Sequence, residues 1–185
     1  MELARRLAAS AAAMSVESGF ERLFDEYSAA IYNYALRMVG DADRAADIAQ
    51  DTFIKAYRKL DTLTDATSTR SWIYRIATNT AIDEMRRRRR VRPMGDDAVT
   101  YAQRPDQRPG PEAQVIGSML DERIGRALLR LRPNHRQCLL LSDLDDMSSQ
   151  QIGEVMDMSH GAVRVLLSRA RSEMRRHLAA EGLTR

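Results

Sequence analysis

The spacing of hydrophobic positions predicts helices along most of the chain. Between Phe20 and Met38, apolar residues recur at intervals of three and four, which is the period of one helix face. Gly40 should end this helix, because glycine adopts the left-handed cap conformation at little cost. The preceding residues, 1–19, are predicted to be a disordered tail, and whether the chain starts at Met1 or Met14 stays open.

Two further helices are predicted before residue 92. The second helix follows Asp41 or Asp43 and runs to about Leu60, and the third starts near Ser68–Ser71. Residues 61–70 between them are rich in Thr, Asp and Ser and have no helical stripe, so we expect a loop. In the third helix, Trp72, Ile73, Ile76, Ala77 and Thr80 should face the core, with Tyr74, Arg75, Thr78, Asn79, Ile82 and Arg86 pointing elsewhere.

Prolines and glycines interrupt the helical pattern between residues 93 and 117. Four of the five prolines and three glycines lie in this stretch, a composition typical of an extended, flexible linker. The linker divides the chain into two small domains, 20–92 and 118–182. Aromatic residues make up only 5% of the chain, and its apolar residues are mostly Ala, Leu, Ile and Met. This composition favours helices over sheets, so the predicted fold class is all-α.

The second domain is predicted to contain four helices. Met119–Leu131 and Asn134–Leu144 are amphipathic, and Pro133 suits the first turn of the latter. Ser148 followed by Gln151 has the spacing of a capping box, so a third helix begins there and ends near residues 157–158. The serine at position 159 can cap the fourth helix.

The last helix has an apolar face and an arginine-rich face. Its apolar face is Val163, Leu166, Leu167, Ala170 and Met174, and Arg164, Ser168, Arg171 and Arg175 lie opposite. Two short helices joined by a tight turn, the second with a basic outer face, predict a helix-turn-helix whose second helix enters the major groove of DNA. Two amphipathic helices with a solvated basic surface are the alternative interpretation.

Charge clustering says more about partners than the small net charge of +3. Arg86–Arg90 follows the third predicted helix, and such a run is typical of a phosphate-binding patch or a disordered tail. Asn79 precedes it by about two turns, and asparagine can pair bidentately with adenine. The outer stripe of the second helix is acidic instead, with Asp47, Gln50 and Asp51. In a chain expected to bind DNA, that stripe favours a protein partner.

No catalytic set emerges from the sequence. A nuclease, as a rival enzyme class, would need a metal cluster or a nucleophile with a base. Asp41, Asp43 and Asp47 come closest, but they surround a helix start, where carboxylates are favoured. Cys138 is the only cysteine, and the three histidines lack ligand-like spacing. We therefore predict no catalytic residue, no metal and no cofactor. No stretch has the length and apolarity of a membrane span.

Three motifs together resemble those of the extracytoplasmic-function (ECF, group 4) sigma factors, the two-domain promoter-specificity subunits of bacterial RNA polymerase. DIAQDTFIKAYR, at 47–58, resembles the family's D-x-x-Q-[ED]-x-F stretch, and WIYRIATNT, at 72–80, resembles its W-[LF]-[YF]-R-I-A-x-N segment. The predicted helix-turn-helix resembles the G-T-V-[KR]-S-R-L-x-R-A-R segment. The resemblance covers about residues 20–92 (sigma region 2) and 118–180 (region 4), and it implies a cytoplasmic bacterial factor rather than an enzyme.

The resemblance also implies three sets of contact residues. The polymerase-binding set is Asp47, Gln50, Asp51, Phe53 and Lys55. The −10 set, which would hold an extruded base, is Thr64, Asp65, Ser68, Arg70, Trp72, Arg75, Asn79, Arg86, Arg87, Arg88 and Arg89. The −35 set is Ser159, His160, Gly161, Ala162, Arg164, Val165, Ser168, Arg169 and Arg171. The implied partners are the clamp and flap of core RNA polymerase, promoter DNA and an anti-sigma factor.

The last motif departs from the family pattern. Val165 and Leu166 stand where the family usually has Ser and Arg, and Ala162 stands where it has Thr, so the −35 sequence cannot be predicted. The alternative class is an ordinary helix-turn-helix regulator that acts without polymerase. Such a regulator explains residues 148–176 but leaves the acidic helix and residues 72–80 without a role.

Overall fold

The computed structural model describes residues 2–60, 63, 68–91 and 122–183, and regular secondary structure in these ranges is helical. The helices are α1 (Glu2–Val39), α2 (Ala42–Lys59), α3 (Thr69–Val91), a helix over 122–130, α5 (Pro133–Asp143), α6 (Ser149–Met156) and α7 (His160–Ala180). The all-α prediction is confirmed. The helices within these ranges are all too short or too polar to cross a membrane. The predicted linker, 93–117, lies outside the described residues.

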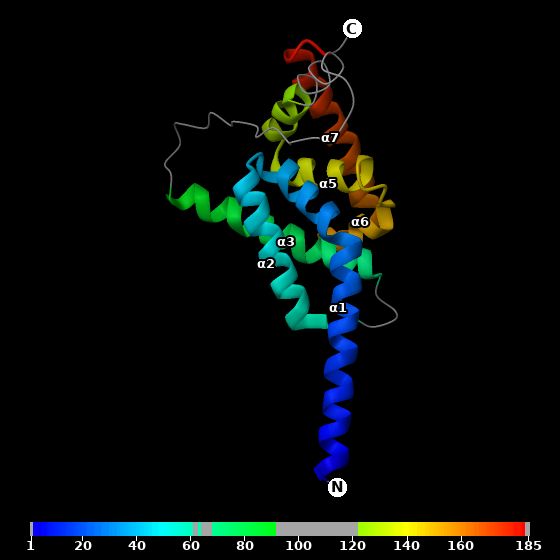
Figure 1. Ribbon diagram of the computed structural model, residues 1–185. Coiled ribbons are helices and arrows are strands. Elements are labelled where there is room, and N and C mark those ends of the chain that lie inside the picture. Colours follow the sequence, from blue (N-terminus) through cyan, green and yellow to red (C-terminus); the bar gives the residue numbers. More distant parts are fainter. Residues whose placement is uncertain (1, 61–62, 64–67, 92–121, 184–185) are drawn as a thin grey trace, which may run out of the picture.

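The first helix is longer than predicted. α1 begins at Glu2 rather than Phe20, so the prediction of a disordered tail is wrong for residues 2–19. This part of α1 projects from the body of the molecule in Figure 1. The stretch is rich in alanine, the best intrinsic helix former, whereas the sequence argument required an apolar stripe. Gly40 ends α1 as expected, with φ 73° and its N–H donating to the carbonyl of Leu36 at 2.7 Å.

α1, α2 and α3 pack together as the first unit of the fold. Asp41 caps α2 by accepting a hydrogen bond from the N–H of Arg44 at 3.0 Å, so this carboxylate serves the helix start. Two polar contacts join α2 to α3. Lys55 Nζ donates to Thr80 Oγ1 at 2.9 Å, and the Arg44 guanidinium lies 3.5 Å from the Glu84 carboxylate.

The helix-turn-helix is formed as predicted. Ser148 and Gln151 make the reciprocal capping box at the start of α6, with distances of 3.3 and 2.9 Å. Asp157 ends α6 in the left-handed conformation, and Ser159 caps α7 by accepting from the N–H of Ala162 at 3.3 Å. Gly153, within α6, lets this turn pack back onto the helix, because a Cβ there would lie 2.6 Å from the carbonyl oxygen of residue 158.

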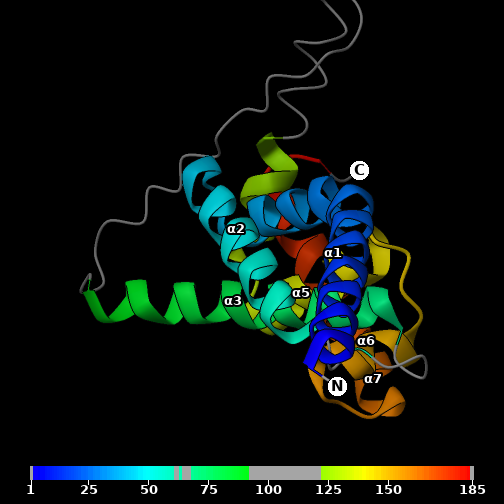
Figure 2. The same ribbon diagram turned by 60° about the horizontal axis from the view of Figure 1, so that its bottom comes forward.

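The two predicted domains share one hydrophobic core. α3 packs against α6 and α1 packs against α5, so the second unit covers part of the first. Figure 2 shows α3 running past this contact, with its carboxyl end projecting from the body. Tyr74 and Thr78 are 1% and 2% exposed, so the prediction that they point away from the core is wrong. Thr78 contacts Tyr34 of α1 within the first unit, whereas Tyr74 contacts Asp145 of the second unit. The helical pattern of one unit cannot show that a second unit covers its outer face.

Candidate nucleic-acid interface and acidic helix face

The amino-terminal half of α7 presents a continuous exposed face. Every member of the predicted −35 set is exposed: Ser159, His160, Gly161, Ala162, Arg164, Val165, Ser168, Arg169 and Arg171. Val163 and Leu167 are buried on the opposite side, and Leu166 is half-buried against the core. Val165 is 51% exposed, as its predicted place near the DNA face requires. This surface is therefore open to solvent.

Arg171 differs from the rest of this set. Its guanidinium donates to the Asp143 carboxylate at 2.6 Å and to Ser142 Oγ at 3.2 Å, at the end of α5. The Asp143 hydrogen bond and charge raise the pKa of Arg171 above its usual value. The side chain is thus committed to a contact within its own unit.

A polar pocket of about 430 Å³ lies between α5 and the later part of α7. Its lining includes Arg132, Arg169 and Arg176 together with the Glu173 carboxylate. Glu173 contacts His135 Nδ1 and lies 3.7 Å from His177 Nε2. Burial raises the pKa of Glu173, but the hydrogen bond and charge of His135 and the N–H of Arg132 outweigh burial, so its pKa is lowered. No metal-binding cluster of three or more ligands occurs in the described part of the chain.

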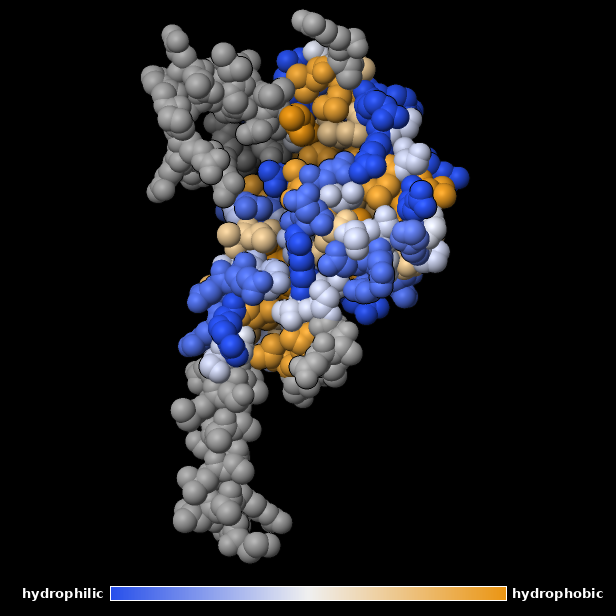
Figure 3. Space-filling model, turned by 90° about the vertical axis from the view of Figure 1, so that its right-hand side faces the viewer, coloured by the Kyte–Doolittle hydropathy of each residue, from blue (hydrophilic) through white to orange (hydrophobic). Residues whose placement is uncertain are grey.

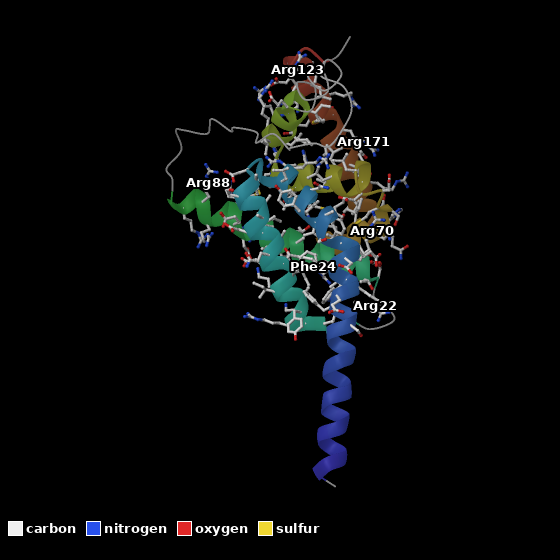
Figure 4. The ribbon with its side chains drawn as sticks, viewed as in Figure 1. Arg22, Phe24, Arg70, Arg88, Arg123 and Arg171 are labelled. Carbon is white, nitrogen blue, oxygen red and sulfur yellow. The ribbon has the colours of Figure 1, made fainter. Side chains whose placement is uncertain are left out.

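The residues of the −10 set differ in their exposure to solvent. Ser68, Arg75, Asn79, Arg86 and Arg87 are exposed, while Arg70, Trp72 and Arg88 are half-buried. Thr64, Asp65 and the side chain of Arg89 lie outside what the structure describes. Arg75, Asn79 and Arg86 are separated by four and seven residues, so they fall on one face of α3. Arg88 lies near the projecting end of α3, far from Arg171 on α7 (Figure 4).

Arg70 and Tyr74 bind the turn between α5 and α6 instead of facing solvent. The Arg70 guanidinium donates to the Asp145 carbonyl, and the Tyr74 hydroxyl donates to the Asp145 carboxylate at 2.5 Å. Burial raises the pKa of Asp145, although Tyr74 and the nearby arginines oppose that shift. Sequence analysis missed Asp145, because its partners lie 71 and 75 residues earlier in the chain.

The acidic face of α2 consists of Asp47, Gln50 and Asp51, which are all exposed. Among the described residues, no ion pair involves either carboxylate. The two other predicted polymerase-binding residues are placed differently. Phe53 is only 5% exposed, and Lys55 donates to a threonine on α3, so neither shares this face.

An apolar groove of about 700 Å³ adjoins the acidic face, between α1 and α2. Phe24, Ile54 and Tyr57 line the groove and are 45%, 42% and 53% exposed. Phe53 forms its wall in an edge-on contact with Phe24, with ring centroids 4.9 Å apart. Figure 4 shows Phe24 between the two helices. Figure 3 shows the side of the molecule that lies at the right in Figure 1, where hydrophilic residues surround several hydrophobic patches. Exposed aromatic rings beside a charged stripe are typical of a protein-binding surface.

Two helical units with a terminal helix-turn-helix and an exposed basic face define a DNA-binding protein. The family models described as "Sigma-70 region 2" and "Sigma-70, region 4" match residues 23–91 and 121–174. The ECF RNA polymerase sigma factor SigW of Bacillus subtilis (strain 168) is 31% identical over 168 residues, which cover 88% of this chain and 90% of that protein. SigL of Mycobacterium tuberculosis (strain H37Rv) is 31% identical over 181 residues, covering 95% and 98%.

The chain therefore belongs to the family of ECF RNA polymerase sigma factors, which direct transcription initiation at promoters. Solved structures agree on the fold. The sigma factor RpoE of Bartonella quintana, in complex with NepR, is 23% identical with a TM-score of 0.71, covering 87% of this chain and 97% of RpoE. CnrH, in complex with the cytosolic domain of CnrY, is 22% identical with a TM-score of 0.64, covering 95% and 97%.

Proposed function

We propose that this sigma factor binds core polymerase in the bacterial cytoplasm through the acidic face of α2 and the groove beside it. The observation that carries the proposal is that Asp47, Gln50 and Asp51 are exposed together beside open apolar side chains. Charged groups at the rim of an interface steer a partner of opposite charge, and apolar anchors supply most of the affinity. The partner surface is therefore basic at its rim and apolar at its centre.

Two helices divide the promoter between them in this proposal. The face of α3 that carries Arg75, Asn79 and Arg86 holds the −10 element and one extruded base. The exposed face of α7 reads the −35 duplex. Extruding a base costs a few kcal/mol, so a fitted contact must offset that cost. The arginines neutralise phosphates, which makes promoter binding weaken as salt concentration rises.

An anti-sigma protein is the third proposed partner. The structural neighbours RpoE and CnrH were solved in complex with NepR and CnrY, and NepR is described as an anti-sigma factor. This likeness supports an equivalent regulator for the present chain. The surface available to a regulator includes the same apolar groove, which would then be closed to polymerase.

Run-off transcription tests the proposed function directly. The purified chain is mixed with sigma-free core polymerase and fragmented DNA of its own genome. Discrete transcripts that depend on the chain are expected, and their start sites give both promoter elements. Absence of transcripts together with failure to co-purify with core polymerase would favour the regulator that acts without polymerase.

Replacing Asn79 with alanine should impair strand opening more than duplex binding. Loss of a bidentate base contact costs about 1–3 kcal/mol, so we expect about a tenfold or greater loss in open-complex formation. Affinity for a duplex −35 fragment should stay within about twofold, because α7 makes that contact. Permanganate footprinting and a duplex binding assay measure the two quantities.

The matched control for this prediction is Asn134→Ala, which makes the same change at another exposed asparagine. Asn134 lies in the first turn of α5 and is outside the predicted −10 set. It should leave both measurements close to wild type. Equal losses in strand opening and duplex binding for Asn79→Ala would contradict a role in holding an extruded base.

A further inference from the structure

Polar contacts hold the region 4 unit against the region 2 unit. The turn between α5 and α6 places Asp145 against α3, where it accepts from Tyr74 and Arg70. Elsewhere in the seam, the buried Arg136 guanidinium of α5 donates to the carbonyl of Met38, near the end of α1. Both contacts join residues from the two different sigma-70 regions.

The Asp145 contact lies beside a buried aromatic layer. Tyr74 and Tyr34 are 1% and 2% exposed, and their rings meet edge-on with centroids 5.5 Å apart. The Tyr34 hydroxyl is 2.8 Å from Thr78 Oγ1, so this hydroxyl has a partner within the first unit. The Tyr74 hydroxyl instead has its partner across the seam. Removing Asp145 would leave that hydroxyl buried without this acceptor, which is costly.

The closed arrangement is too short to engage both promoter elements. The −35 and −10 elements are named by their positions along the promoter, so they lie about 25 base pairs apart. At 3.4 Å per base pair, this separation is about 85 Å of duplex. α7 has 21 residues and is therefore only about 30 Å long, and its unit is packed directly on α3. The two units must part before one chain can occupy both elements on a straight duplex.

We propose that Asp145 is an autoinhibitory latch that holds the two units closed and keeps Arg70, at the base of the −10 loop, away from DNA. The inference rests on the proposed −10 role of Arg70 for its functional consequence. The −35 face on α7 stays exposed in the closed form, so the latch restrains the −10 side selectively. Opening frees Arg70 and Tyr74 together, because both are bound to the same residue.

The latch should tighten as the pH falls. Burial raises the pKa of Asp145 above its usual value, despite the opposing Tyr74 and the positive charges of Arg70 and Arg37; Asp146 acts in the same direction as burial. The closed form therefore holds a proton more tightly than an open form in which the carboxyl meets water. The resulting preference for the closed form is present below the ordinary carboxyl pKa and is lost as pH rises through the raised value.

Cys138 provides a probe of opening in the natural sequence. It is the only cysteine, it is fully buried on α5, and it lies close enough to Tyr34 of α1 to affect the pKa of that tyrosine. Burial raises the pKa of the Cys138 thiol to about 11, so it should react slowly in the closed form. Its rate of reaction with dithiobis(nitrobenzoate) in native buffer reports the population of open chains.

Four variants of the full chain test the latch. Asp145→Ala and Tyr74→Phe remove the same hydrogen bond from opposite sides, and each should raise the labelling rate about tenfold or more. Asp145→Asn keeps an accepting oxygen for Tyr74 and should stay within about twofold of wild type. Asp146→Asn, at the exposed neighbouring position, should do the same, because asparagine tolerates the left-handed conformation of that residue (φ 46°). The wild-type rate divided by the Asp145→Asn rate at the same pH cancels the ionisation of the thiol, and this ratio should rise as pH rises through the raised pKa of Asp145.

The latch is contradicted if Tyr74→Phe leaves the rate unchanged, because the effect of Asp145→Ala would then be damage to its own turn. A fall in the urea midpoint large enough to explain the faster labelling would also contradict it. Binding of the variants to a mixed-sequence single-stranded DNA oligonucleotide separates the latch proposal from the proposed −10 role of Arg70. Faster labelling with tighter DNA binding supports both. Faster labelling without tighter binding supports the latch and removes the −10 assignment of Arg70.

Discussion

Exchanging Asp47 and Asp51 together for lysine should reduce affinity for core polymerase by about a hundredfold or more. Loss of a paired charge in an interface typically costs 2–5 kcal/mol, and the introduced lysines would also repel a basic partner surface. The fold should be preserved, because both side chains are exposed and no described ion pair depends on them. Co-sedimentation or surface-immobilised binding to core enzyme measures the affinity, with helix content checked by circular dichroism.

The control for this charge reversal is Glu21→Lys with Asp25→Lys. These two residues are also exposed and four positions apart, on α1 rather than α2, so the net charge changes by the same amount. Affinity for core polymerase should fall much less than in the α2 variant. If both double variants lose affinity equally, long-range charge rather than the acidic face of α2 sets the interaction, and the assignment is wrong.

Features encoded within a few residues were predicted well from the sequence. The capping box at Ser148 and the cap at Ser159 depend on side chains three positions from their partners, and both are formed. The exposure of Asp47, Gln50 and Asp51 followed from helical periodicity alone. These local rules place side chains on a face of a helix. The roles of those faces toward polymerase and promoter stay predictions.

Features created by contact between the two units could not be predicted in this way. Tyr74 occupies an outward position when α3 is considered alone, but it contacts the ring of Tyr34 on α1 and Asp145 in the turn before α6, and it is buried. Asp145 lies in a polar stretch typical of a surface turn, yet two residues of α3 bind it. Pairings across more than 70 residues leave no periodic signal. The arrangement of the units therefore came only from the structure.

The shared core changes how the two-domain organisation should be understood. A flexible connection alone would let each unit search for its own promoter element. Here the apolar residues of α1 and α3 are continuous with those of α5 and α6, so separation must expose part of that core. Burial of apolar side chains stabilises the contact between the two units, and the polar groups within that contact reduce the apolar area that it buries. A partner that lies in the opened seam could supply the missing burial.

The second large effect is expected on the free energy of unfolding, when Arg136 is replaced. Its guanidinium is 5% exposed and donates to the carbonyls of Leu128 and Leu131 at 2.9 and 3.2 Å, and also to those of Leu129 and Met38. These groups lie near the ends of helix 122–130 and α1, where carbonyls lack helical partners. Sequence analysis did not single out this arginine, because the argument from clustering treated arginines as phosphate ligands.

Replacing Arg136 with methionine should lower the free energy of unfolding by about 3 kcal/mol or more, because several buried carbonyls lose charged donors together. For a chain of this size, that corresponds to a fall in Tm of about 10 °C. Arg136→Lys should recover little, because an ammonium cannot span carbonyls that a planar fork reaches. Urea denaturation measures the change.

Arg130→Met is the matched control for Arg136→Met. Arg130 is 51% exposed and pairs at 2.9 Å with Glu181, which also pairs with Arg126 at 3.1 Å. Glu181 therefore keeps a charged partner in Arg130→Met, and the expected loss is about 1 kcal/mol or less. If Arg136→Met is no more destabilising than Arg130→Met, the carbonyl network does not stabilise the fold. If Arg136→Met is the more destabilising variant, labelling of Cys138 should also accelerate, because Arg136 contacts Met38 across the seam between the units. An unchanged labelling rate in a destabilised variant would confine the role of Arg136 to its own unit.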